Sequence, residues 1–179
     1  MSDPKPDVLE RVQDILRRFG AAGDLLETRG LPLYEDAAEL EVAEVTPEGR
    51  QHLLVPAAAS AWRRLKHCAK SDGIEVFIVS AFRSFDRQVE LVARKLRQGR
   101  SIDEILSVVA PPGCSEHHTG QAVDVGTMGC PPLEEAFDTT AAFSWMIQHA
   151  REFGFGLSYG LSNPCGFAYE PWHWCYGKQ

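Results

Sequence analysis

The sequence predicts an α+β fold, in which a single domain has an antiparallel sheet with helices packed on one side of it. The chain has 179 residues, enough for one compact domain and too few for two of ordinary size. Hydrophobic residues make up 44% and charged residues 24%, which is the balance of a folded protein. Helical patterns lie mainly in the first half of the chain and strand patterns in the second, whereas a doubly wound sheet would alternate them.

Five segments have apolar residues at helical spacing and are predicted as helices. The third begins after Ser84, whose side chain can cap it, and Asp86 follows near the positive end of the helix dipole. Glycine follows four of the five patterns, as expected where helices end. The predicted helices cover residues 8–19, 58–69, 85–96, 101–109 and 143–153.

Short runs rich in β-branched and aromatic residues are predicted as strands. In the run 121–125, Val123 and Val125 share one face, whereas Ala122 and Asp124 share the other. The irregular segment that follows, up to residue 138, is interpreted as a part of the pocket wall or a lid. The predicted strands cover residues 40–45, 53–55, 74–79, 121–125, 155–157, 167–169 and 173–176.

The first 55 residues contribute a helix and short strands, and we expect them to belong to the same domain as residues 56–179, which carry the candidate site. Five acidic residues cluster within the first 55 residues. They are interpreted as a solvated edge rather than a cation site. The five are Glu35, Asp36, Glu39, Glu41 and Glu44.

The charge balance limits the partners of the chain. Lys and Arg number 18 and Asp and Glu 25, so the net charge is −7. Binding to a nucleic-acid backbone requires clustered positive charge, so no nucleic-acid partner is expected. No apolar run approaches the roughly 18 residues that span a bilayer, so no membrane span is expected. The chain is expected to be a monomer. The first residues lack the apolar region of an export signal. A cytoplasmic location follows, or the periplasm or cell envelope if a signal has been removed.

The five cysteines cannot all pair within the chain, and none forms a C-x-x-C motif. The first interpretation is reduced thiols, as in a cytoplasmic protein. The alternative is one or two disulfides, with Cys114–Cys130 and Cys165–Cys175 as the pairs that close short loops.

The segment from Ser115 to Asp124 carries the first chemical signal. His117 and Asp124 lie seven residues apart, which is the wrong interval for one helix face. The interval suits a loop that reverses at Gly120 and returns as a strand. A carboxylate in an apolar strand needs a partner, and zinc is one candidate. An Asp that caps a turn or pairs with an Arg, beside an exposed His, is the other interpretation.

The segment Glu170-Pro-Trp-His173 carries the second signal. With His117 and Asp124, His173 completes two imidazoles and one carboxylate, and three protein ligands plus water are typical of catalytic zinc. Such a site keeps a charge of about +1, which lowers the pKa of water. Glu170 is then placed to take the proton of that water. An aromatic core patch beside an exposed Glu is the alternative.

Arg83 follows the predicted strand 74–79 and precedes a helix. Its guanidinium can face a developing oxyanion or a substrate carboxylate, or it can pair with a surface acid. Gln88 lies one turn further along the helix.

Three segments together resemble the zinc D-Ala-D-Ala carboxypeptidase family, the VanY-like group related to VanX-type dipeptidases and phage peptidoglycan L,D-endopeptidases. The family pattern is S-x-x-R-S with a following Gln, then S-x-H-x-x-G-x-A-x-D, then E-x-W-H. The resemblance covers roughly residues 56–176. The matching segments are Ser80-Ala-Phe-Arg83-Ser84 with Gln88, Ser115-Glu-His117-His-Thr-Gly120-Gln-Ala122-Val-Asp124, and Glu170-Pro-Trp172-His173.

The resemblance implies a hedgehog/D-Ala-D-Ala peptidase-like fold with one Zn²⁺ per chain, and hydrolysis of peptidoglycan stem peptides or other D-Ala-terminated peptides. It implies His117, Asp124 and His173 as zinc ligands. Glu170 and Arg83 would be catalytic, and Ser115, Gln88 and Trp172 would line the substrate pocket. His118 falls at a variable position and is interpreted as lying outside the ligand set.

The resemblance favours a D-Ala-D-Ala carboxypeptidase and leaves a dipeptidase or an endopeptidase open. A non-catalytic binding module with a structural zinc is a further alternative. Such a module would need a fourth protein ligand, and Cys114 and Cys175 are the candidates. Both Glu170 and Arg83 argue against this module, because a structural site needs neither.

Overall fold

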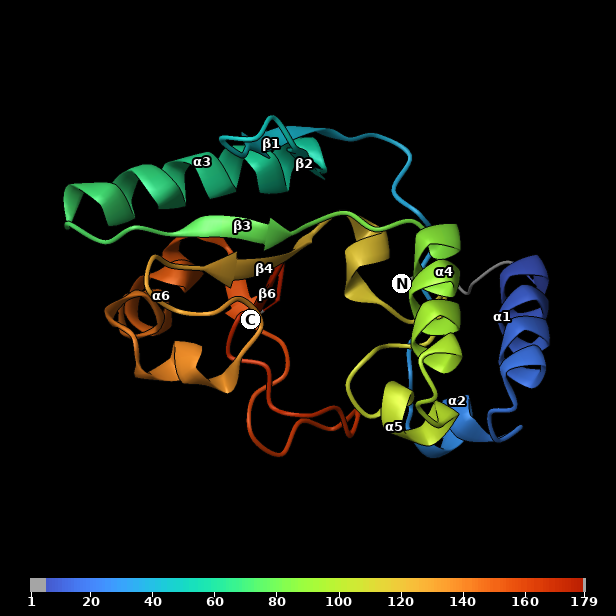
Figure 1. The fold of residues 1–179 in the computed structure, drawn as a ribbon. Coiled ribbons are helices and arrows are strands. Elements are labelled where there is room, and N and C mark those ends of the chain that lie inside the picture. The colour runs from blue at the N-terminus through green and yellow to red at the C-terminus, as the bar shows by residue number, and fades with distance from the viewer. Residues whose placement is uncertain (1–5, 179) are drawn as a thin grey trace.

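The computed structural model describes residues 6–178 and centres on a four-stranded sheet (Figure 1). The strand order is β3-β4-β6-β5, and every neighbouring pair is antiparallel. This arrangement confirms the predicted α+β class with an antiparallel sheet. The strands are β3 (Phe77–Ser80), β4 (Ala122–Gly126), β5 (Phe155–Leu157) and β6 (His173–Tyr176).

Helices α3 (Pro56–Ser71) and α6 (Ala141–His149) cover one face of this sheet. The main core joins apolar side chains of both helices to those that the strands point toward them, and burial of this area is the chief stabilising term. The largest of its fully buried side chains include Trp62, Leu65, Met146, Phe155 and Trp174. The helices therefore lie on one side, as predicted, and the opposite side of β4 is left for polar groups.

A separate hairpin, β1 (Glu41–Val45) and β2 (Gln51–Leu54), packs beside α3. Its buried Leu54 belongs to the main core, and the carbonyl of Leu53 accepts a hydrogen bond from the backbone N–H of Phe82. The hairpin is thereby joined to the connection that leaves β3.

A second group of helices stands at the other end of the molecule (Figure 1). Its small core joins Val12 and Leu16 to Phe85 and Leu106. Ser84 accepts a hydrogen bond from the N–H of Arg87 and so caps one of these helices, as predicted. The group comprises α1 (Pro6–Phe19), α2 (Leu25–Thr28), α4 (Phe85–Arg97) and α5 (Ile102–Leu106).

The predicted strand at 167–169 is wrong, because this segment is irregular. Its backbone groups bond to two separate segments instead of one neighbouring strand. The N–H of Phe167 donates to the side chain of Asn163, and the N–H of Ala168 donates to the carbonyl of Ser107. The strand predicted at 74–79 begins only at Phe77. The helix predicted at 143–153 ends at His149 and continues as a 3₁₀ turn, Ala150–Phe153.

The interpretation of the acidic residues 35–44 as a solvated edge is wrong for Glu44. Its side chain is only 10% exposed, pairs with Lys66 at 2.9 Å and accepts a hydrogen bond from the indole of Trp62. Asp36 also has a structural task, because it accepts the backbone N–H of Phe85 at 2.8 Å, at the start of α4.

All five cysteines are free thiols, so neither of the two alternative disulfides is formed. Within residues 6–178, no helix combines the length and the apolar composition that crossing a bilayer requires.

Candidate functional site

Two of the predicted ligands face each other across neighbouring strands. Asp124 of β4 pairs in register with His173 of β6, and Nδ1 of His173 lies 3.0 Å from Oδ1 of Asp124. Asp124 and Ala122 lie on the same side of β4, away from the core that holds Val123 and Val125. The sheet register therefore fixes the separation of these two side chains.

The loop before β4 brings the third predicted ligand to the pair. A short 3₁₀ turn, Glu116–Thr119, ends at Gly120, which has φ +65°. A Cβ at this position would lie 2.9 Å from Leu40 and 3.1 Å from Val55. The reversal therefore requires glycine both for its positive φ and for the lack of space for a side chain. Nε2 of His117 lies 3.2 Å from Oδ2 of Asp124 as a result.

The donor atoms of His117, Asp124 and His173 all lie within 4.8 Å of one another, and all three residues are buried. The two imidazole rings are nearly perpendicular, at 89°, with centroids 4.9 Å apart. Nδ1 of His117 is buried without a hydrogen-bond partner among the described residues, which is a costly arrangement for a polar atom. Two imidazoles and a carboxylate with an unsatisfied nitrogen fit a zinc ion.

Sequence reasoning missed Glu116, which is buried behind this cluster. Its Oε2 lies 3.0 Å from Nε2 of His173 and accepts a hydrogen bond from Ser158 at 2.5 Å, while its other oxygen pairs with Lys178. An acidic residue directly before a candidate ligand was the available signal. The contact with Lys178 could not be seen, because the two residues lie 62 positions apart.

The charges of the cluster follow from these contacts. Burial opposes charge on His173, but its hydrogen bonds to Asp124 and Glu116 outweigh burial and raise its pKa to about 10. Burial lowers the pKa of His117 to about 4, so this imidazole is neutral. Burial would raise the pKa of Asp124, yet its charge interactions with the two histidines hold that pKa well below its usual range. The metal-free cluster therefore holds an imidazolium between two carboxylates.

Glu170 stands beside the cluster without entering it. Its Oε2 lies 4.0 Å from Nδ1 of His173, and its side chain is 14% exposed. Burial raises the pKa of Glu170 to about 7, where a carboxylate can both accept and return a proton. Its backbone N–H donates to the carbonyl of Tyr159, which holds the turn before β6 in place.

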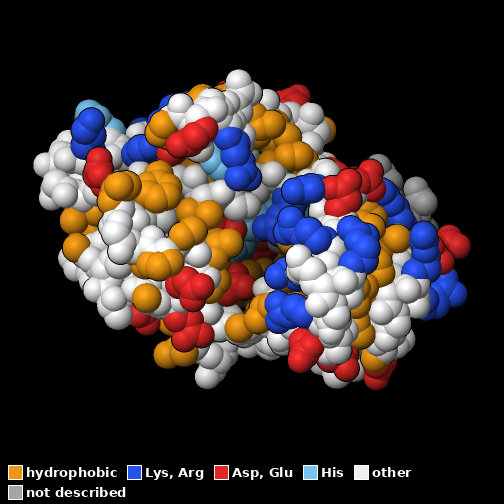
Figure 2. Space-filling view, viewed as in Figure 1, with side chains coloured by type: hydrophobic (Ala, Val, Ile, Leu, Met, Phe, Trp, Pro, Cys, Tyr) orange, Lys and Arg blue, Asp and Glu red, His pale blue; other side chains and the backbone are white. Residues whose placement is uncertain are grey.

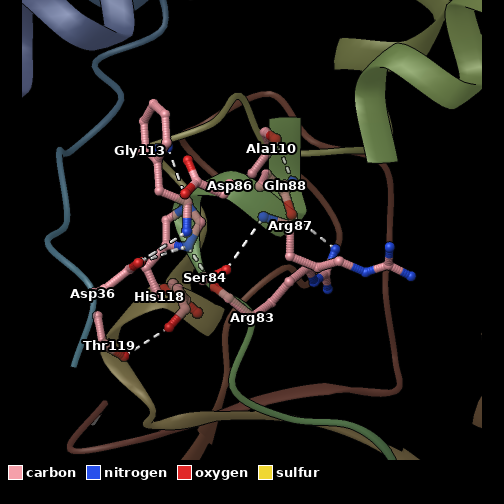
Figure 3. A network of polar contacts seen from close by, with 12 residues as sticks. Asp36, Arg83, Ser84, Asp86, Arg87, Gln88, Ala110, Gly113, His118 and Thr119 are labelled. Carbon is pink, nitrogen blue, oxygen red and sulfur yellow. Dashed lines mark hydrogen bonds and ion pairs between the residues drawn. The ribbon is translucent and has the colours of Figure 1, made fainter. Parts of the chain in front are cut away.

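Arg83 is held by a chain of hydrogen bonds that Figure 3 shows. Its Nη1 donates to the amide oxygen of Gln88 at 3.0 Å, and Gln88 in turn donates to the carbonyl of Ala110 at 2.6 Å. Burial lowers the pKa of Arg83, and the charges of Asp124 and Glu170, which line the same cleft, oppose this shift. The amide of Gln88, predicted to line the substrate pocket, is thus largely engaged in orienting Arg83.

His118, interpreted from the sequence as lying outside the ligand set, is fully buried and bonded on both nitrogens. Its Nε2 accepts the backbone N–H of Gly113 at 3.1 Å, so Nδ1 carries the proton and donates to the carbonyl of Arg83 at 2.6 Å. The imidazole therefore fastens the Arg83 backbone to the loop that carries His117 (Figure 3).

The cluster lies at the floor of a cleft of about 500 Å³ between the sheet and the helical group. Figure 2 shows this hollow between the two halves of the molecule. The cleft is lined by the eight residues singled out from the sequence: Arg83, Gln88, Ser115, His117, Asp124, Glu170, Trp172 and His173. Among the described residues, Cys114 and Cys175 do not belong to the donor cluster, and burial raises the pKa of each thiol to about 12.

The fold and the site together define an α+β domain with a candidate metal site. A buried His-Asp-His cluster lies on one face of an antiparallel sheet, and a glutamate lies at the edge of the cluster. The family model described as "VanY: D-alanyl-D-alanine carboxypeptidase" matches residues 51–179. The chain belongs to this family, and the resemblance found in the sequence is thereby confirmed.

Among similar proteins, YodJ of Bacillus subtilis (strain 168), named as a carboxypeptidase, is 37% identical over 128 residues, which are 68% of this chain and 46% of YodJ. The structure of the LdcB LD-carboxypeptidase is 30% identical, with a TM-score of 0.71, and covers 81% of this chain and 71% of LdcB. The chain thus spans about half the length of YodJ.

A structure of a mutant of the vancomycin resistance D,D-pentapeptidase VanY, in complex with Zn(II), is also similar to this chain. It is 25% identical, with a TM-score of 0.63, and the match covers 83% of both chains.

Proposed function

We propose that this chain is a zinc-dependent carboxypeptidase that removes the C-terminal residue from D-Ala-terminated peptides of the peptidoglycan type. The observation that carries the proposal is the buried cluster of His117, Asp124 and His173 at the floor of a cleft, with Glu170 beside it. Family membership and the Zn(II) complex of the related VanY support the metal and the substrate class.

His117, Asp124 and His173 would hold the ion. Their donor set suits zinc, and the unsatisfied Nδ1 of His117 shows that the hydrogen bonds of the metal-free cluster are incomplete. When bound there, Zn²⁺ supplies a Lewis acid for the peptide carbonyl and for the attacking water.

The side chains around the cluster transfer the proton, stabilise the developing charge and contact the peptide. Glu170 accepts a proton from the attacking water and returns it to the amine of the departing residue, for which its raised pKa is suited. The guanidinium of Arg83, held in place by Gln88, stabilises the negative charge that develops on the carbonyl oxygen. Ser115 and Trp172, which line the cleft, contact the peptide.

Digestion of a peptide panel by the zinc-loaded protein tests the proposal. The panel contains a stem pentapeptide ending in D-Ala-D-Ala, its L-Ala-L-Ala counterpart, free D-Ala-D-Ala and a cross-linked muropeptide, with products identified by mass spectrometry. Release of single D-Ala from the pentapeptide is expected. Cleavage of the dipeptide or the cross-link alone would identify a dipeptidase or an endopeptidase, and cleavage of no peptide would contradict the proposal.

Zinc binding is expected to strengthen with pH and to release protons. His173, with its pKa near 10, is protonated in the metal-free protein at neutral pH, whereas a metal ligand must be neutral. Each released proton makes the affinity rise about tenfold per pH unit, up to about pH 9. Titration calorimetry in two buffers of different ionisation enthalpy at each pH counts the protons. An affinity that does not change between about pH 6 and 8 would contradict the ligand role of His173.

Glu116→Gln is expected to lower zinc affinity about 10- to 100-fold, as loss of an outer-shell partner does. The carboxylate of Glu116 keeps a proton on Nε2 of His173, so that Nδ1 faces Asp124 and the cluster. Competition with a zinc-binding dye measures the affinity. Glu152→Gln is the matched control, since Glu152 contacts the histidine of an exposed pair, His149. Equal affinities of the two variants would refute the role of Glu116.

A further inference from the structure

One wall of the cleft is cationic although the chain carries a net charge of −7. Arg94 and Lys95 of α4 line the cleft together with Arg83. Figure 2 shows Lys and Arg side chains gathered along this side of the hollow. A concentration of positive charge in a cleft of an acidic protein attracts anions to that cleft.

Arg94 and Lys95 have no acidic partner within residues 6–178. Elsewhere on α4, Arg87 pairs with Glu90 at 2.7 Å. Lys95 instead has Arg94 and Arg100 as its charged neighbours, which, after burial, lower its pKa. Like charges held together at a cleft wall without counter-charge have favourable interactions to gain from an anionic ligand.

The opposite wall has the reverse charge. Glu134 and Glu135, in the segment that follows β4, line the cleft across from α4. A carboxylate that enters the cleft is therefore attracted to α4 and repelled by this segment, so the two walls fix the orientation of an anionic peptide.

The geometry of α4 sets the distance between the cationic pair and the cluster. Gln88, Leu91 and Lys95 follow one another at intervals of three and four residues and line the cleft along one helix face. From Phe85, beside Arg83, to Lys95 the helix rises about 15 Å, at about 1.5 Å per residue. An extended peptide covers that length in about four residues. The long side chains of Arg94 and Lys95 shorten the span by about one residue.

We propose that Arg94 and Lys95 form a binding site for a carboxylate that the substrate carries three or four residues before the bond that is cut. The inference rests on the proposed function, because a carboxypeptidase leaves only the N-terminal side of the peptide long enough to reach this wall. The substrate class is thus an acidic peptide, with its negative charge remote from the C-terminus.

The test compares two stem tetrapeptides that differ in one group. The first is L-Ala-γ-D-Glu-L-Lys-D-Ala, and in the second the α-carboxylate of the D-Glu is an amide. Titration calorimetry with the zinc-loaded Glu170→Gln variant, which is expected to keep zinc and lose turnover, gives Kd for each peptide without cleavage. The acidic peptide is expected to bind about three- to tenfold more tightly, as befits two exposed ion pairs. The preference should shrink when salt is raised from about 50 to about 500 mM.

The double substitution Arg94→Gln and Lys95→Gln is expected to abolish the preference, with KM for the corresponding pentapeptide raised and kcat retained. Arg97→Gln is the matched control, because Arg97 lies on the same helix, is exposed and does not line the cleft. It should leave the preference intact.

Equal Kd values for the two peptides, undetectable binding of both, or a preference that survives the double substitution would overturn the inference. Failure to cleave either pentapeptide would contradict the proposed function, and the Kd comparison would still decide the carboxylate site.

Discussion

Glu170→Gln is expected to lower kcat about 100- to 10,000-fold while zinc remains bound, because an amide cannot take a proton from water. The substitution keeps the size of the side chain, and Glu170 lies 4.0 Å from Nδ1 of His173, outside the donor cluster. Turnover of a D-Ala-D-Ala-terminated pentapeptide, together with the zinc content of the same preparation, measures both effects.

Glu90→Gln is the control for this substitution. Glu90 is exposed on α4, does not line the cleft and does not belong to the donor cluster. Its loss should leave kcat within a few fold of the unaltered protein. If Glu170→Gln kept most of the activity, a group other than this carboxylate would have to move the proton.

His173→Ala is expected to remove tight zinc binding, and with it all measurable hydrolysis. The change deletes one of three donors, so the loss of affinity should exceed the roughly 10- to 100-fold that an outer-shell substitution costs. It also leaves Asp124 and Glu116 buried without their shared imidazole partner. Metal analysis after dialysis against a weak chelator measures the loss.

His149→Ala provides the comparison, because His149 is a partly exposed histidine that contacts Glu152 and the ring of Trp145. It should keep one zinc per chain. Circular dichroism establishes that both variants are folded. Zinc retained by folded His173→Ala at normal affinity would contradict the ligand assignment.

The grouping of most side chains at the candidate site could be predicted from the sequence, because its main parts are local. The interval from His117 to Asp124 contains both the turn and the strand that bring the two side chains together, and Gly120 marks the reversal. The strand containing His173 had the aromatic composition, with Trp174 and Tyr176, that fits beside β4. Apolar periodicity was sufficient for the long helices, where one face is buried in a core.

The remaining features depend on contacts between distant parts of the chain. Glu116 is held in place by contacts with Lys178 and Ser158, and no sequence pattern near residue 116 indicates either partner. Glu44 looked like a surface acid until α3 placed Lys66 and Trp62 against it. The segment 167–169 has strand-like residues, but no strand lies beside it, and propensity without a pairing partner does not make a sheet.

The three donors are held by two kinds of backbone, and this has a consequence for the choice of ion. Asp124 and His173 lie on hydrogen-bonded strands, whereas His117 belongs to a short 3₁₀ turn whose Gly120 packs closely against Leu40 and Val55. A cation of larger radius than zinc, such as Cd²⁺, would require one of these two supports to shift. We therefore expect the packing of the turn against Leu40 and Val55 to favour an ion of the size of zinc.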